Sequence, residues 1–142
     1  MSNSQPSLIL VLNCGSSSIK FAVFPVDADP LPRTPLWNGK VQGIGGPAPN
    51  FGESGVEPFP VELDAEHPHT AALQFIQERI SKRLDGRRVT TVAHRVVHGG
   101  SRYWAPTLVT PQILDDLRSY IPLAPLHQSF PLKAMGLLLE QR

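Results

Sequence analysis

A short polar stretch, Asn13-Cys14-Gly15-Ser16-Ser17-Ser18, is followed at once by Ile19 and Lys20 and carries groups suited to binding an anion. Its small residues would let a ligand approach the backbone amides closely. Three hydroxyls, the Asn13 carboxamide and the Lys20 ammonium could converge on the same group, and the chemistry that needs such a loop is phosphate binding. An ordinary hairpin with a serine-rich turn is the alternative. Lys20 favours the phosphate interpretation, because a cation just past an amide-rich turn has an obvious use.

A second group of polar side chains interrupts the stretch 89–98. This stretch is rich in β-branched residues and predicts an interior strand, yet it carries His94, Arg95 and His98. An unpaired buried charge is costly, and ligands of α/β sheets bind at the carboxyl ends of strands. Arg95 is therefore a candidate ligand-binding residue, or else a structural one paired with carbonyls or a carboxylate. His94 and His98 share a face and could suggest a metal, but no third ligand lies nearby in the sequence.

Two strands are expected on either side of the polar loop. The apolar run over 8–12 is bounded by turn residues and predicts a buried strand, and the alternation over 19–24 predicts a second one. The segment from Pro25 to Pro68 holds nine of the fifteen prolines, so we expect loops joining short strands over 36–44 and 59–63. A low-complexity linker is the alternative for this segment.

Helical patterns begin at Pro68. An apolar stripe typical of a core-facing helix runs from there to Gly86 and consists of Leu73, Ile76, Ile80 and Leu84. A second helix is expected to be capped by Thr110 and to end at Pro122, with Ile113, Leu117 and Ile121 buried. An apolar loop over 123–128 would hold His127. A last helix is expected to begin near Pro131 and to bury Leu132, Met135 and Leu139.

The composition narrows the class of protein. A chain of 142 residues with 41% hydrophobic residues can form one domain with a real core. A net charge of +1 and 7% aromatic residues argue against nucleic-acid binding. Cys14 is the only cysteine, which excludes an internal disulfide and a cysteine-cluster metal site. The first apolar run is too short for a signal peptide or a membrane span, so we expect a soluble cytoplasmic protein.

Three blocks, in order, carry a resemblance to a known family. Residues 13–21, 93–100 and 123–127 resemble signatures of the acetate kinase family of short-chain acyl phosphotransferases. The third block departs from the family pattern, because Gln128-Ser129-Phe130 follows His127 where members often continue with Asn-Pro. Members of this family are well over twice as long, so the resemblance predicts that residues 1–142 form an incomplete amino-terminal domain, without the carboxyl-terminal domain.

The resemblance implies a fold and a reaction. The fold would be the ribonuclease-H-like α/β domain of the actin and sugar-kinase superfamily, a mixed sheet with flanking helices. The reaction would be reversible transfer of the γ-phosphoryl group of ATP to acetate, giving acetyl phosphate and ADP with Mg²⁺, in a complete protein that is a homodimer. The implied alternatives are a propionate or butyrate kinase. Without the rest of the protein, this chain would be inactive.

The resemblance also implies roles for individual residues. Asn13 would lie beside the magnesium ion and the transferring phosphoryl group, and Arg95 would hold the acetate carboxylate and the developing acyl phosphate. The remaining residues would be Gly15, Ser16, Ser18 and Lys20 for the phosphates of ATP, Val97 and Leu126 for the acetate methyl group, and His127 at its border. Independently of the resemblance, phosphoryl transfer depends on positioning and charge stabilisation, and a guanidinium matches carboxylate and phosphate groups in a bidentate fashion. A non-catalytic module that binds phosphate, carboxylate or a partner protein is the other hypothesis.

Overall fold

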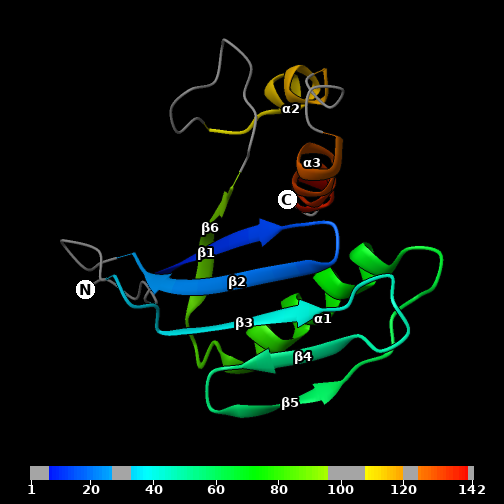
Figure 1. Cartoon of the computed structure of the whole chain (residues 1–142). Helices are drawn as coiled ribbons and strands as arrows, with labels where there is room; N and C mark the ends of the chain where they lie inside the picture. Colours follow the sequence, from blue (N-terminus) through cyan, green and yellow to red (C-terminus); the bar gives the residue numbers. More distant parts are fainter. Residues whose placement is uncertain (1–6, 27–32, 96–107, 120–124, 141–142) are drawn as a thin grey trace, which may run out of the picture.

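The structure, a computed structural model, describes residues 7–26, 33–95, 108–119 and 125–140, with the backbone alone for 125–130 and 139–140. Figure 1 shows the chain as a sheet with helices against it. In chain order the elements are β1 (Ser7–Cys14), β2 (Ser18–Pro25), β3 (Trp37–Gln42), β4 (Asn50–Glu53), β5 (Val56–Pro60), α1 (Pro68–Arg83), β6 (Arg88–His94), α2 (Pro111–Arg118) and α3 (Pro125–Glu140).

The sheet is mixed. Its six strands run in the order β5-β4-β3-β2-β1-β6, and the first five strands of the chain pair antiparallel as successive hairpins. The chain then crosses through α1 and returns as β6, which lies parallel to β1 on its other side. This crossover places the ends of β1 and β6 side by side, and the expected α/β class with a mixed sheet is confirmed.

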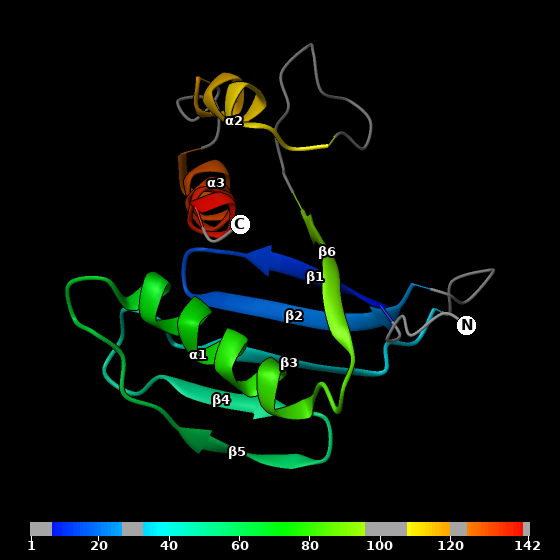
Figure 2. The ribbon, with the colours of Figure 1, turned by 180° about the vertical axis from the view of Figure 1, so that it is seen from behind.

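One face of the sheet is covered and the other lies open within the described residues. Figure 2 shows α1 lying across the covered face, and α3 contacts both α1 and β1. Alternate residues of the strands point into this core, among them Leu8, Leu10, Leu12, Ile19, Phe21, Val23, Val41 and Phe51. From α1 the core receives Ala72, Leu73, Ile76 and Ile80, so the predicted apolar stripe is confirmed, with Leu84 partly buried beside it.

Charged groups also fix α1 on the sheet. The Glu53 carboxylate is buried on β4 and forms ion pairs with Arg79 and Arg83 of α1. The guanidinium of Arg79 also lies 5.4 Å from the ring centre of Phe51, and that of Arg83 lies 5.0 Å from the ring centre of Trp37. A buried carboxylate with two cationic partners tolerates little displacement, so these contacts hold the helix in one register on the sheet.

The proline-rich segment differs from the expectation in two places. The strand expected over 59–63 is instead β5, Val56–Pro60, and β4 was not predicted at all. Gly55, at φ 79°, forms the turn that pairs these two strands. Pro58 and Pro60 have no backbone N–H group to donate. Because β5 is an edge strand, this loss does not weaken the hydrogen bonds between the inner strands of the sheet. The linker alternative is wrong for the described part of the segment.

The last two helices confirm the predicted cap of α2 and correct the expected end of α2 and the expected start of α3. Thr110 caps α2, its Oγ1 accepting from the Ile113 amide at 3.2 Å. However, α3 begins at Pro125 rather than near Pro131, so the expected loop is helical over 125–128. Pro131 is buried inside the helix, where Leu132 and Met135 pack against Leu114 and Leu117 of α2. This packing outweighs the loss of one helical hydrogen bond at the proline. α2 ends at Arg118 rather than at Pro122, and it buries Leu114 and Leu117, with Ile113 only partly buried. Ile121 and Pro122 lie outside the described residues, as does the Leu139 side chain.

Candidate functional site

The loop between β1 and β2 is held by its carbonyl groups. The Gly15 amide donates to the Ser18 carbonyl at 2.8 Å, and the Ile44 amide donates to the Ser17 carbonyl at 2.9 Å. His69 Nε2, from the first turn of α1, lies 3.2 Å from the Gly15 oxygen and 2.9 Å from the Ser16 oxygen. The four carbonyls of residues 15–18 are therefore all engaged. Within the part of the chain that the structure describes, the amides of Ser16 and Ser17 donate no such bond.

Polar and cationic residues form a row across the sheet beside this loop. Asn13 pairs directly with Lys20, and Lys20 pairs with Lys40 on β3. On the other side, the Arg95 amide donates to the Leu12 carbonyl at 3.1 Å, which places Arg95 next to Asn13. Strand alternation directs these four residues to the open face, because Leu12 and Ile19 point into the core. Lys20, Lys40 and Arg95 are exposed and Asn13 is half-buried.

A hollow of about 580 Å³ lies over this open face. Asn13, Lys20 and Lys40 line it, and Ala22 and Gly52 lie at its floor, where small residues leave the space unfilled. Neighbouring strands are about 4.8 Å apart, so the row brings three cationic side chains within reach of one extended anion. An anion of two or more phosphate groups matches this combination of amide, ammonium and guanidinium donors.

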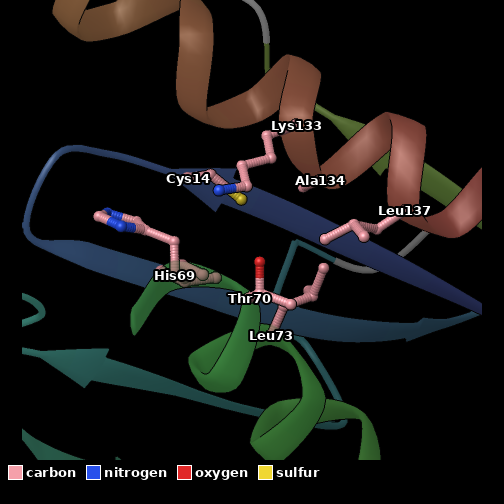
Figure 3. Close-up of a pocket in the computed structure, with 8 residues that line it drawn as sticks. Cys14, His69, Thr70, Leu73, Lys133, Ala134 and Leu137 are labelled. Carbon is pink, nitrogen blue, oxygen red and sulfur yellow. The ribbon is translucent and has the colours of Figure 1, made fainter. Parts of the chain in front are cut away.

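On the opposite side of the loop, the described residues enclose only a small cavity. Figure 3 shows Cys14 together with His69 and Leu73 of α1 and with Lys133 and Leu137 of α3. These residues line a cavity of only about 10 Å³. That volume holds about one water molecule. Burial raises the pKa of the Cys14 thiol to about 11, so the thiol stays protonated near neutral pH and is a poor nucleophile. We therefore expect the loop to bind a ligand on the open face of the sheet.

Metal binding by this chain alone finds little support. Among the described residues there is no group of three or more His, Cys, Asp or Glu side chains that could hold an ion. Burial lowers the pKa of His94 to about 4, and its Nδ1 is buried without a partner among the described residues. His98, the other member of the suggested pair, lies outside them. Asn13 adds one neutral oxygen, whereas protein Mg²⁺ sites use one or two carboxylates together with phosphates and waters. The described residues therefore do not form a magnesium site by themselves.

The structure brings together six of the residues singled out from the sequence: Asn13, Gly15, Ser16, Ser18, Lys20 and Arg95. Val97 lies outside the described residues, and so do the side chains of Leu126 and His127 in the first turn of α3. One premise was wrong. Arg95 was expected on a buried interior strand, where its charge would need a partner. β6 is instead an edge strand of the described sheet and Arg95 is exposed, so burial gives no reason to expect a ligand at Arg95.

Two residues at this site were not singled out from the sequence. Lys40 joins the row only through the pairing of β2 with β3, which no local pattern reveals. His69 reaches the loop across 53 positions of chain, and its place in the first turn of a helix carries no signal of that contact.

Comparisons with solved structures define the class of protein. The chain superimposes on an acetate kinase from Porphyromonas gingivalis with a TM-score of 0.73 and 30% identity, covering 92% of this chain and 33% of that one. A propionate kinase from Francisella tularensis gives the same TM-score at 26% identity and the same coverage. The fold is thus that of the first third of short-chain acyl kinases.

Sequence comparison gives the family. Residues 8–140 match the model of the Acetokinase family, and the chain belongs to that family. It is 37% identical to an acetate kinase of Kocuria rhizophila over 95% of this chain and 35% of that protein. A propionate kinase of Escherichia coli is also 37% identical, over 84% of this chain and 28% of that protein. The chain thus spans about a third of the length of these relatives.

Proposed function

We propose that this chain is the amino-terminal, phosphate-binding part of an acetate kinase, which transfers the γ-phosphoryl group of ATP to acetate. The observation that carries the proposal is the row of Arg95, Asn13, Lys20 and Lys40 beside a loop in which the Ser16 and Ser17 amides have no hydrogen-bond acceptor among the described residues. A carboxylate and a polyphosphate are both anions, and this row offers donors to each of them. Membership of the Acetokinase family supports a short-chain carboxylate as the acceptor of the phosphoryl group.

In the proposed reaction a carboxylate oxygen of acetate attacks the γ-phosphorus. The bond to the oxygen bridging the β- and γ-phosphates breaks, and ADP leaves with that electron pair. Arg95 would hold the attacking carboxylate and the equatorial phosphoryl oxygens in a bidentate fashion. Lys20 and the amides of Ser16 and Ser17 would bind the phosphates of ATP, with the hydroxyls of Ser16 and Ser18 beside them. Val97, Leu126 and His127 would border the acetate methyl group.

Gly15 supports a close approach of the ligand. A Cβ atom at this position would meet nothing nearer than the Ser18 oxygen at 3.6 Å, and the residue has no positive φ. Folding of this chain therefore does not require a glycine here. Open space above a backbone that needs no glycine is suited to a phosphate group lying directly on the loop.

Magnesium would enter this site with the nucleotide. When bound, the ion would neutralise charge on the phosphates, and Asn13 is the residue of this chain that would lie beside it. The other ligands would be phosphate oxygens, waters and residues beyond this chain. None of the roles given to Arg95, Lys20 or the loop amides depends on that ion.

The identity of the acyl group, the compartment and the assembly belong to the same proposal. No helix among the described residues is long and apolar enough to cross a membrane. We propose a cytoplasmic enzyme that acts as a homodimer when complete. Because a propionate kinase is also 37% identical, over a slightly shorter part of this chain, propionate is the second candidate acceptor.

The test is acyl phosphate formation from ATP by the complete protein that carries this sequence, with acetate, propionate and butyrate compared. We expect acetate to have the highest kcat/KM, and the 142-residue chain alone to show negligible turnover. Phosphate binding by the chain without phosphoryl transfer by the complete protein would favour the non-catalytic alternative. Turnover by the chain alone at rates typical of enzymes, 1–10³ per second in order of magnitude, would show that the remaining two thirds are not needed.

A further inference from the structure

We propose that His69 is a positioning residue for the β1–β2 loop: its Nε2–H group holds two successive carbonyls on the core side and so turns the Ser16 and Ser17 amides toward the ligand. The inference concerns the geometry of the loop. Only its consequence for anion binding rests on the proposed function.

The hydrogen bonds assign the proton on the imidazole. Nε2 lies 3.2 Å from the Gly15 oxygen and 2.9 Å from the Ser16 oxygen. A carbonyl oxygen can only accept, so Nε2 must carry the hydrogen and share it between the two oxygens. The same hydrogen is present in the neutral Nε2–H tautomer and in the imidazolium. The interaction therefore does not require the ring to change its charge.

Peptide geometry then directs the amides. In a planar trans peptide, the C=O of one residue and the N–H of the next point in opposite directions. Because the Gly15 and Ser16 carbonyls point to His69, the Ser16 and Ser17 amides point away from it. His69 lies on the covered side of the sheet with Cys14 and Ile19, as Figure 3 shows for Cys14. The amides therefore point to the other side, where Asn13 and Lys20 line the hollow.

The neighbouring contacts make His69 a rigid support. Its helix is fixed on the sheet by the ion pairs of Glu53 with Arg79 and Arg83. The Ser17 carbonyl is held separately by the Ile44 amide at 2.9 Å. With every carbonyl of residues 15–18 held by the protein, the loop does not have to reorganise when an anion arrives, which is the condition for strong electrostatic stabilisation.

The experiment compares variants of the 142-residue chain by NMR. His69→Phe keeps a ring of similar size but removes the donor, and His69→Gln restores an N–H donor. His67→Phe is the matched control, because His67 is exposed and makes no side-chain bond as the helix cap. The readouts are the imidazole ¹⁵N shifts of His69, the amide shifts of Ser16 and Ser17, and titration with inorganic phosphate.

We expect an Nε2–H tautomer in the wild type and displaced Ser16 and Ser17 amide signals in His69→Phe, with both signals near their wild-type positions in His67→Phe. Loss of one neutral hydrogen-bond donor should weaken phosphate binding about three- to tenfold, with partial recovery in His69→Gln. An Nδ1–H tautomer, or unchanged amide signals in His69→Phe, would overturn the inference. If His69→Phe does not fold, the tautomer and the His69→Gln spectrum still decide it. If the wild-type loop has this geometry but binds no phosphate, the proposed function fails and the inference stands.

Discussion

At the scale of single residues, the directly opposed pair of Lys20 and Lys40 is unfavourable in the chain alone. Like charges facing each other across antiparallel strands are destabilising, and both ammonium groups border the same hollow. An anion bound between them would remove this repulsion. Lys20 also faces Asn13 and is one strand closer to the loop than Lys40, so the two lysines should differ in their contribution.

Under the proposed function, we expect Lys20→Ala in the complete protein to raise the KM for ATP or lower kcat more than Lys40→Ala does. Neither substitution should lower the melting temperature, because each one removes a repulsion rather than a contact. Steady-state kinetics and thermal melts check both statements. Equal kinetics in wild type and Lys20→Ala would make Lys20 an ordinary solvated lysine.

Arg95 is the residue whose substitution should affect the proposed reaction most. Arg95→Lys keeps the charge but loses the bidentate fork, so kcat/KM should fall substantially, and Arg95→Ala should lose about 2–4 kcal/mol of transition-state stabilisation. The side chain is exposed, so circular dichroism and melting should stay near wild type. Unfolding of either variant would show instead that Arg95 is a structural residue.

At the scale of elements, the pairing of β2, β3 and β4 depends on Gly39. A Cβ atom there would lie 2.6 Å from the Gly52 carbonyl oxygen and 2.7 Å from the Phe21 ring. The glycine therefore lets the aromatic core of Phe21 and Phe51 pack directly under β3.

Gly39→Ala should destabilise the chain by about 1–3 kcal/mol, the usual cost of overpacking, whereas Gly52→Ala should be neutral or slightly stabilising. The control is matched because a Cβ at Gly52 meets only Pro58, at 3.6 Å. Urea denaturation measures both values. Similar stabilities for the two variants would mean that the sheet adjusts freely around Gly39.

At the scale of the whole molecule, two partly buried histidines make stability depend on pH. Burial lowers the pKa of His94 from 6.5 to about 4. Burial is also the main cause of the lowered pKa of His69, and Lys133 adds to it against the raising effect of the two carbonyl bonds. Between the folded and unfolded pKa values the unfolded chain binds more protons, so stability rises with pH in that range.

The part of the unfolding free energy that depends on neutral His94 should therefore be fully present above about pH 6.5 and should be lost as the pH falls toward 4. We expect a loss on the order of 2 kcal/mol over that window, after allowance for partial solvent screening. Denaturant unfolding at pH 7, 6, 5 and 4 measures it. His94→Leu should flatten the curve, because its half-buried side chain has no proton to gain. A steep curve retained in that variant would assign the pH dependence to other groups.

The sequence by itself determined the parts of this protein that depend on local order. Alternation put Ile19, Phe21 and Val23 on the opposite strand face from Lys20, and the structure buries the first of these faces. The 3.6-residue period identified Leu73, Ile76 and Ile80 as core residues of a helix, and the structure buries them too. The polar loop and Lys20 stood out because their residue types suit an anion whatever surrounds them. The family could be recognised from ordered blocks that lie within the matched residues 8–140.

Only the tertiary structure decided which distant residues meet. Lys40 faces Lys20 because β3 pairs with β2 in one register, and His69 reaches the loop because α1 packs across the covered face. α3 continues through Pro131, where Leu132 and Met135 pack against α2, although the local preference of a proline is for the first turn of a helix. Propensity and periodicity describe each element separately. Pairing register and helix docking are collective results of burial, so they could not be read from any one stretch of the chain.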